Sequence, residues 1–259
     1  MVKCEKCSLI FTNPRPDQDH IGKYYENIDY ISHTNKATNL LNIVYKFVRN
    51  YTFYKKRTLI TSHTTGKRLL DFGCGSGAFI KYLQSHQYNS EGFETHQATN
   101  EYAEKYTGVP IYSQLDHLTK QNKYDVITAW HVLEHVHDLL GTLNTLRKSL
   151  SDNGLMFVAL PNHLSADASH YKSNWAAYDV PRHLYHFDPD TFSKLAAKCK
   201  LNIITQVPRI FDSYYVSLLS EQHITGSSNI LKAIRQGYTS NKSARKTAHY
   251  SSLIYILKK

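Results

Sequence analysis

Long apolar runs, cysteines and acidic residues are all scarce in this sequence of 259 residues. No apolar stretch approaches the roughly 20 residues that cross a bilayer, and the start Met1–Cys4 lacks the apolar core of a signal peptide. We therefore expect a cytoplasmic protein without a membrane span. Lys and Arg number 31 against 21 Asp and Glu, a formal net charge of +10. This excess favours anionic partners, although a solvated basic surface is the simpler interpretation.

Four cysteines are too few and too scattered for a disulfide framework. Cys4 and Cys7 have the spacing of half a zinc site, but a closed site needs four ligands, usually from two such pairs. Neither Cys74 nor Cys199 is a natural second pair. Cys4 and Cys7 are thus either a partial zinc site or two free thiols, and we expect no other metal.

The stretch Leu69–Ile80 organises the chain. An apolar run ends at Asp71, and glycines then occupy positions 73, 75 and 77 before apolar spacing resumes. This pattern is typical of a buried strand that turns tightly into a helix, with glycine where the backbone approaches a ligand closely. The dinucleotide fingerprint has its third glycine one position later, where this chain has Ala78. Glu94 ends the next predicted strand, where its carboxylate can accept hydrogen bonds from ribose hydroxyls.

Strand and helix patterns alternate after the glycine loop. Alternation of this kind predicts a Rossmann-like, doubly wound α/β fold whose mostly parallel sheet of about seven strands carries helices on both faces. Asp188 or Asp190 is placed to cap the helix that follows it. The expected strands are 68–72, 90–94, 109–112, 124–130, 155–160, 201–205 together with residues near 212–218, where a helical turn is the alternative, and 251–257; the expected helices are 39–62, 78–85, 97–106, 139–150 and 189–199.

At this point a family resemblance emerges. Leu70–Gly77 resembles the first motif of class I S-adenosylmethionine-dependent methyltransferases, and Glu94 matches their ribose-binding acid. Tyr124–Val136 resembles the fourth-strand motif of one branch, the small-molecule enzymes related to ubiquinone biosynthesis. The remaining matches are Leu160–Asn162, Val180–Phe187, and the segment Cys4–Pro16, which resembles the end of a zinc ribbon whose first cysteine pair is missing here.

The resemblance implies a role for each matching residue toward the cofactor S-adenosyl-L-methionine. Asp71 and the loop would hold the amino-acid part, and Glu94 the ribose. The positions after the third strand would border the adenine, and those at the end of the fourth strand would line the methyl group. The implied cofactor-binding residues are Asp71, Gly73, Cys74, Gly75, Gly77, Glu94, Leu115, Asp116, Trp130 and His131.

Methyl transfer needs proximity and orientation, with a base where the acceptor carries a proton. Histidine is the natural base near neutral pH, and His131, His183 and His186 are the catalytic candidates. His135 is more simply explained as a structural residue near the following helix. A metal site formed by His131, Glu134 and His135 is a less favoured alternative.

The segment 163–187 is polar and aromatic, and we interpret it as a substrate lid. Trp175 and Tyr185 would form an aromatic wall, and Arg182 would bind an anion. The alternative is a packed loop with Trp175 and Phe187 as core anchors. By domain, we expect an N-terminal segment 1–35 with the zinc-ribbon remnant and a methyltransferase domain 36–259 that includes a variable, mobile insertion at 220–250.

The predicted function is methylation of a small or carrier-linked metabolite, at an O, N or C atom that the sequence does not identify. Two alternatives stay open: an RNA methyltransferase and a non-catalytic S-adenosylmethionine-binding module. Leu160–Asn162 stands where amino-directed nucleic-acid methyltransferases usually carry an Asn/Asp-Pro-Pro-aromatic motif, so a nucleic-acid partner is not expected. A nicotinamide oxidoreductase ranks last because of the glycine spacing.

Overall fold

A computed structural model describes residues 1–25, 40–120, 123–227 and 229–259. Among these residues the larger sheet has seven strands in the order β5-β4-β3-β6-β7-β10-β9, and a smaller sheet has the order β1-β2-β8. The predicted Rossmann-like class is thereby confirmed. The strands are β1 (Val2–Lys3), β2 (Ile10–Phe11), β3 (Arg68–Phe72), β4 (Asn89–Phe93), β5 (Ile111–Tyr112), β6 (Tyr124–Trp130), β7 (Leu150–Pro161), β8 (Tyr185–His186), β9 (Asn202–Pro208) and β10 (Ser252–Lys258).

Helices connect the strands as the alternation predicts. Strand β3 pairs in parallel with both β4 and β6, and β4 pairs in parallel with β5. No described helix combines the length and apolar character needed to cross a bilayer. The helices are α1 (Leu40–Thr61), α2 (Ala78–Gln84), α3 (Gln97–Thr107), α4 (Leu115–Lys120), α5 (Leu139–Ser149), α6 (Ala166–Tyr171), α7 (Pro189–Lys198), α8 (Asp212–Thr225) and α9 (Ile230–Thr247), with 3-10 turns η1 (Ile21–Tyr24), η2 (Leu133–His135), η3 (Lys172–Asn174) and η4 (Ala176–Tyr178).

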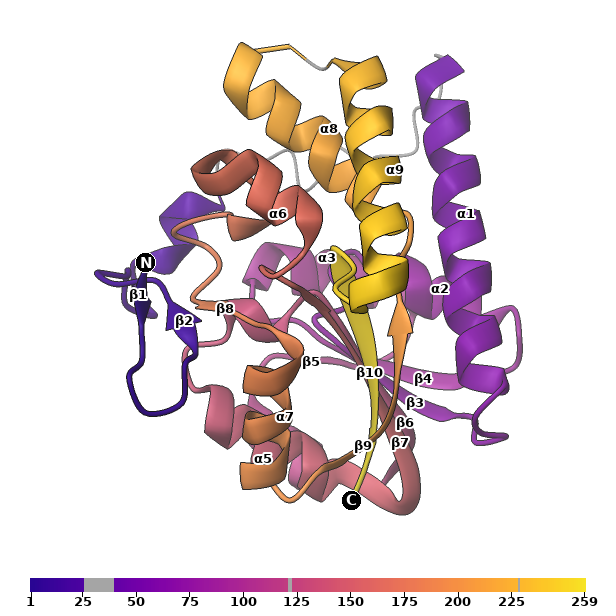
Figure 1. Cartoon of the computed structure of the whole chain (residues 1–259). Coiled ribbons are helices and arrows are strands. Elements are labelled where there is room, and N and C mark those ends of the chain that lie inside the picture. The colour runs from indigo at the N-terminus through magenta and orange to yellow at the C-terminus, as the bar shows by residue number, and fades with distance from the viewer. Residues whose placement is uncertain (26–39, 121–122, 228) are drawn as a thin grey trace. The chain divides into compact units, whose positions relative to one another are not determined.

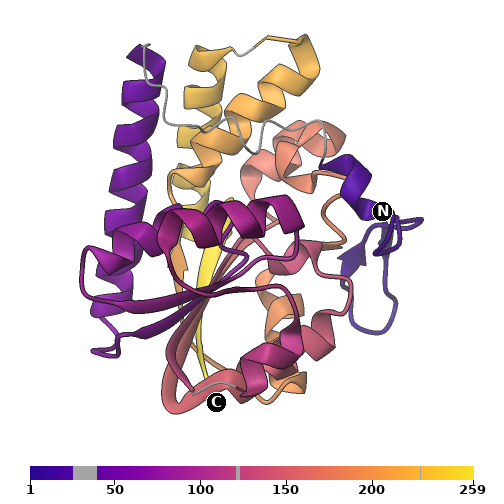
Figure 2. The same ribbon diagram turned by 180° about the vertical axis from the view of Figure 1, so that it is seen from behind.

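One compact unit comprises Gly22–Ala129, Asn144–Phe157 and Lys259, as far as these residues are described. Its core lies on β3, where Leu69 and Leu70 are fully buried. Helix α2 packs against β4 and also touches α1 and α3, all in purple in Figures 1 and 2. The burial of the apolar β3 run explains why this strand reads as a continuous hydrophobic stretch in the sequence.

The other unit comprises Met1–Ile21, Trp130–Leu143 and Val158–Lys258. Strands β9 and β10 pair antiparallel, and α7 packs on β9 (Figure 1). Asp188 caps α7: its side chain accepts a hydrogen bond from the Thr191 N–H, and the Thr191 hydroxyl accepts one from the Asp188 N–H. The structure thus selects Asp188 over Asp190 as the cap.

The region after β9 differs from the prediction. Residues 212–218 form the start of α8 in place of the expected strand, and the segment 220–250 contains the whole of α9, which packs along α8 (Figure 1). The insertion at 220–250 remains a prediction. Small polar residues explain why the two segments do not read as helices. The Ser213 hydroxyl donates to the carbonyls of Ile210 and Gly237, and the Asn241 amide donates to Ser213. The Ser213 hydroxyl and the Asn241 N–H groups thus find acceptors at the contact between the two helices, although such residues are typical of a loop.

The N-terminal segment forms a short hairpin. Cys4 N–H donates to Leu9 O at 2.9 Å, and Ser8 N–H donates to Cys4 O at 2.9 Å. Cys4 and Cys7 lie in this turn, and neither belongs to a disulfide. Strand β2 pairs antiparallel with β8. The first 21 residues therefore belong to the unit that contains β8, whereas the predicted division into 1–35 and 36–259 remains a prediction.

The contact between α8 and α9 generates a stability prediction. A Cβ atom on Gly237 would lie 2.6 Å from Tyr214 Cδ1 and 2.9 Å from Tyr214 Cα. Helix propensity alone predicts that Gly237→Ala stabilises the protein by about 1 kcal/mol. The clash with backbone predicts the opposite sign, a loss of about 1–3 kcal/mol in the free energy of unfolding. Urea denaturation measures the difference.

Gly22→Ala is the matched control, because a Cβ at Gly22 meets no atom within 4 Å. We expect a change within about 0.5 kcal/mol for this variant. A Gly237→Ala protein as stable as wild type, or more stable, would contradict the packing described for α8 and α9.

Candidate functional site

Three glycines form the turn that leaves β3. Gly73, Gly75 and Gly77 have φ angles of 74°, 53° and 74°, which lie in the left-handed region that side chains disfavour. A Cβ on Gly77 would also lie 2.6 Å from Thr107 Cγ2 of α3. The turn therefore requires glycine at position 77 for two independent reasons, its backbone conformation and the packing of α2 on α3.

Glu94, directly after β4, holds this turn in place. Its Oε2 accepts a hydrogen bond from Gly75 N–H at 3.1 Å, and its Oε1 accepts one from His96 N–H at 3.0 Å. The Asn100 amide donates to the carbonyls of Glu94 and Ile111, both at 2.9 Å. The carboxylate is half-buried and retains lone pairs beyond these two bonds. The predicted ribose-binding acid thus lies beside the glycine turn.

Asp71 lies at the end of β3 and is 3% exposed. The Thr128 hydroxyl of β6 donates to its Oδ1 at 2.6 Å. Burial raises the pKa of Asp71 to about 6, while the positive charge of Lys56 and the Thr128 hydrogen bond act in the opposite direction. The protonation of this carboxyl group therefore changes near neutral pH. Thr128, which sequence reasoning missed, is the residue that orients it.

The other predicted cofactor-binding residues lie on several different elements. Cys74 is buried against Ile80, Ala103 and Ile111, and burial raises the pKa of its thiol, so this side chain serves packing. In the first turn of α4, Leu115 is half-buried and Asp116 is exposed. Trp130 is half-buried at the end of β6.

His131 follows β6 with a φ of 57°, a left-handed conformation that is uncommon for a residue with a side chain. Its Nε2 lies 3.1 Å from Asp212 Oδ2, and its Nδ1 lies 3.4 Å from Glu134 Oε1. Burial opposes a positive charge on the imidazole, but hydrogen bonding with Asp212 and Glu134 outweighs it and raises the pKa of His131. Both ring nitrogens therefore face carboxylates, which favours the imidazolium form.

Asp212, in the first turn of α8, was missed by sequence reasoning. Arg209 Nε donates to Asp212 Oδ2 at 2.8 Å. Burial opposes ionisation, but the charge of Arg209 and the hydrogen bond with His131 hold the pKa of Asp212 well below its usual range. Glu134 is fully buried, and His131 likewise lowers its pKa against the effect of burial. Two acids, one imidazole and one guanidinium thus form a compact charged cluster.

His183 and His186, the other catalytic candidates, are buried. His183 Nδ1 lies 2.8 Å from Ala177 O, and His186 Nε2 lies 3.1 Å from Thr12 Oγ1. Burial, reinforced by the charges of His183 and His163, lowers the pKa of His186 to about 3. The His186 ring is therefore neutral near pH 7, and its Nε2 is occupied by the contact with the Thr12 hydroxyl.

The structure groups a different set of possible metal ligands from the set considered from the sequence. Glu134, His135 and His183 each place a ligand atom within 4.8 Å of the others. Burial lowers the pKa of His135 to about 4, so its ring is neutral at pH 7. Two imidazoles and a carboxylate are a donor set that suits a divalent transition metal. His131 was part of the metal site considered from the sequence, but it is not in this group. Its ring lies between Asp212 and Glu134.

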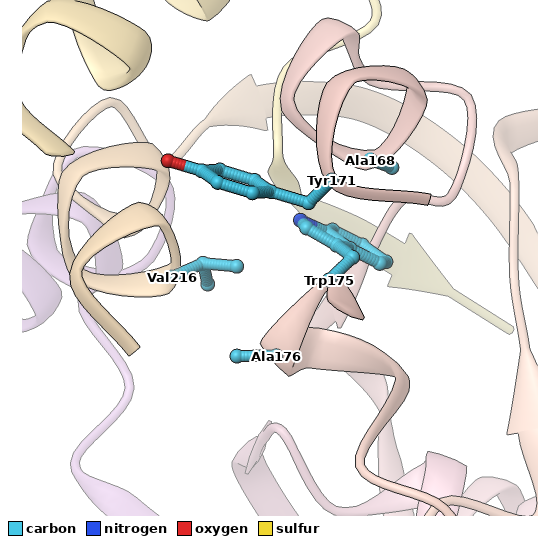
Figure 3. Packing of buried hydrophobic residues seen from close by; sticks show 5 residues of the cluster. All are labelled: Ala168, Tyr171, Trp175, Ala176 and Val216. Atoms are coloured by element: carbon cyan, nitrogen blue, oxygen red, sulfur yellow. The ribbon is translucent and has the colours of Figure 1, made fainter. Parts of the chain in front are cut away.

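The predicted lid residues are largely engaged with the protein itself. Trp175 is 2% exposed, and its indole N–H donates to Asp167 Oδ2 at 2.8 Å. It packs with Tyr171 and with Val216 of α8, as Figure 3 shows. This arrangement fits the core-anchor alternative and leaves little of the ring for a substrate.

Arg182 and Tyr185 lie nearer the surface. Arg182 Nε donates to Asp179 Oδ1 at 3.0 Å, and Tyr185 hydroxyl donates to His137 O at 3.1 Å. Both side chains are half-buried. A substrate role for these two residues remains a prediction.

The glycine turn and its neighbours lie within a region that is similar to known proteins. A family model described as a methyltransferase domain matches residues 46–206. The chain belongs to the methyltransferase-domain family. The matched range contains the glycine turn, Glu94, Asp71 and the His131 segment, and ends within β9.

Curated relatives match this methyltransferase-domain chain over less than half of their own length. The chain is 34% identical over 110 residues to the ubiquinone biosynthesis O-methyltransferase of Histophilus somni (strain 2336). That match covers 38% of this chain and 46% of the relative, so the chain spans less than half the length of this curated protein.

Solved structures share the fold over more of the chain. Magnesium protoporphyrin IX methyltransferase from Synechocystis PCC 6803, with bound S-adenosylhomocysteine, has a TM-score of 0.60 at 12% identity, covering 94% of this chain and 100% of that chain. An O-methyltransferase from a Brevibacillus brevis polyketide synthase, in complex with S-adenosyl-L-homocysteine, has a TM-score of 0.56 at 17% identity, covering 84% and 75%. At these identities the likeness shows the fold alone.

The charged cluster generates a prediction about the proton on His131. In wild type we expect the pKa of His131 to lie above 6.5, and Asp212→Asn to lower it because the carboxylate next to Nε2 is removed. A raised folded-state pKa contributes stability that is present below the unfolded-state pKa and is lost as pH rises through the folded-state value. NMR titration of the imidazole measures the pKa, and Tm against pH measures the linkage.

Asp190→Asn serves as the control, because this exposed aspartate contacts neither ring nitrogen of His131. A His131 that titrates at or below 6.5 in wild type would contradict the assignment. So would an Asp212→Asn protein in which its pKa does not move.

Proposed function

We propose that this protein is an S-adenosylmethionine-dependent methyltransferase that acts on a small or carrier-linked metabolite. The acceptor atom, O, N or C, is left open. A nucleic-acid substrate is not part of the proposal, because Leu160–Asn162 stands where amino-directed nucleic-acid methyltransferases usually carry an Asn/Asp-Pro-Pro-aromatic motif.

One observation carries the proposal. The left-handed glycine turn after β3 and the Glu94 carboxylate after β4 are joined by the hydrogen bond from Gly75 N–H to Glu94 Oε2. The turn permits close approach of a ligand to backbone, and the acid beside it can accept from vicinal hydroxyls. This pairing fits an amino acid linked to a ribose, which is the chemistry of S-adenosylmethionine. Membership in the methyltransferase-domain family supports it.

The residues of the turn would have distinct tasks toward that cofactor. The backbone from Gly73 to Gly77 and the Asp71 carboxylate would bind its amino-acid part, and Glu94 its ribose. When bound, S-adenosylmethionine supplies an electrophilic methyl group on a sulfonium. The protein's main contribution to such a displacement is orientation, because the reacting atoms must lie in line.

The contacts of the histidines limit which of them can act as a base. His131 is held between two carboxylates, so we assign it to charge placement and expect no general-base role while both contacts are made. His186 is neutral but engaged with Thr12. The small-molecule class of the acceptor is supported by the relatives, which are ubiquinone biosynthesis O-methyltransferases.

Binding of S-adenosylmethionine and S-adenosylhomocysteine by isothermal titration calorimetry tests the proposal. We expect both to bind wild type, and Glu94→Ala and Asp71→Asn to weaken binding roughly 10- to 100-fold, since each removes a charged acceptor. Glu104→Ala, at an exposed acid of α3, is the matched control and should leave binding unchanged. Intact, folded wild type that binds neither compound would overturn the proposal.

The pKa of Asp71 adds a pH dependence. We expect affinity to fall as pH drops through about 6, because the protonated carboxyl group no longer accepts a charged donor. Thr128→Val removes the hydrogen bond that lowers this pKa, so the midpoint should move to higher pH. A midpoint that stays in place in Thr128→Val would show that another group controls binding. The same calorimetric titration, repeated from pH 5 to about 8, measures the midpoint.

A further inference from the structure

The tip of the α8–α9 hairpin exposes large apolar side chains. We define the hairpin tip as Ile224 at the end of α8 together with Ile230, Leu231 and Ile234 at the start of α9, which are 51%, 61%, 81% and 52% exposed. Tyr238, one turn further along α9, is 56% exposed. Both helices belong to one compact unit, and Figure 1 shows the hairpin with its connecting turn at the top of the view. Contiguous apolar exposure of this kind marks an interaction surface.

The exposed side chains lie on one face of a well-packed helix. Ala233, Gly237 and Ala244 are buried on the opposite face of α9, against α8. Leu231, Ile234 and Tyr238 follow a spacing of three and four residues, so they share a stripe of the helix surface. The exposure is therefore a consequence of how α9 packs, since the small residues occupy the inner face and the large apolar ones point outward.

Positive charge continues the same stripe. Lys242 and Arg245 follow Tyr238 at spacings of four and three, and both are exposed. The sequence from 222 to 247 contains five Lys and Arg and no Asp or Glu. The stripe thus has an apolar end at the hairpin tip and a basic end about two to three turns further along α9.

We propose that this stripe docks on the surface of a bilayer that contains anionic lipids, with the hairpin tip inserted among the acyl chains and the basic end against the headgroups. The arrangement matches that of interfacial amphipathic segments, which combine buried apolar area with attraction to anionic lipids. This binding is peripheral and independent of the proposed function, because it uses none of the residues assigned to the cofactor.

Charge decides between this occupant and the others. A second copy docked face to face in parallel register would bring two basic ends together, and in antiparallel register it would press each basic end against the partner's apolar tip, so charge opposes both contacts. An anionic surface neutralises Lys242 and Arg245 while the apolar tip leaves water. A nucleic acid would use the charge but would leave the aliphatic tip in water, because stacking needs aromatic rings and the tip contains none.

Vesicle co-sedimentation with the full chain tests the proposal. We expect wild type to bind vesicles of phosphatidylglycerol and phosphatidylcholine at least tenfold more tightly than vesicles of phosphatidylcholine alone, with affinity falling as salt rises. The double variant Leu231→Asp/Ile234→Asp should lose binding to both kinds of vesicle. Lys242→Gln/Arg245→Gln should weaken binding to the anionic vesicles by about tenfold or more and abolish most of the salt dependence.

Leu140→Asp is the matched control, since Leu140 is an aliphatic residue 37% exposed on the surface of α5. It should bind as wild type does. Circular dichroism and Tm confirm that each variant is folded, because every substituted side chain points into solvent. Wild type that fails to bind anionic vesicles overturns the proposal, as does an unchanged Leu231→Asp/Ile234→Asp variant. A dimer seen by light scattering that this double variant dissolves would assign the stripe to a second copy instead.

Discussion

The hydrogen bonds of the Glu94 carboxylate are the interaction on which the glycine turn and its surroundings depend. The carboxylate bonds to Gly75 N–H and His96 N–H, and thereby joins the turn after β3 to the turn after β4. These turns follow neighbouring parallel strands, so their carboxyl ends meet at one edge of the sheet. Loss of the acid would remove a ligand group and also release two backbone donors at the same place.

Charge compensation organises the other unit in a comparable way. Glu134 and Asp212 are carboxylates held within a largely buried environment, which is costly unless cations lie close by. His131 and Arg209 supply those cations. The consequence for function is that His131, a natural base from its sequence position, is the charged partner of two acids. Its local backbone, with a φ of 57°, is part of what brings the ring between them.

A third buried acid explains why the segment proposed as a lid is so firmly attached. Asp167 of α6 is fully buried and accepts hydrogen bonds from the Trp175 indole and from the hydroxyls of Ser240 and Ser251. These donors come from the turns after α6, from α9 and from the residue before β10. A single carboxylate thus connects three segments, and the small hydroxyls of α9 serve packing and polar satisfaction together.

The sequence by itself determined the alternation of strands and helices, the glycine turn and the acid at the end of β4, because these depend on local periodicity and on the conformations open to glycine. The Leu69–Phe72 run and the spacing of Gly73, Gly75 and Gly77 carry that information within a few residues. Only the tertiary structure decided that 212–218 and most of 222–249 are packed helices, because Ser213, Gly237 and Asn241 are accommodated in the contact between α8 and α9. It also decided the partner of His131, since Asp212 lies 81 residues along the chain, and a carboxylate so far away leaves no trace in any local pattern.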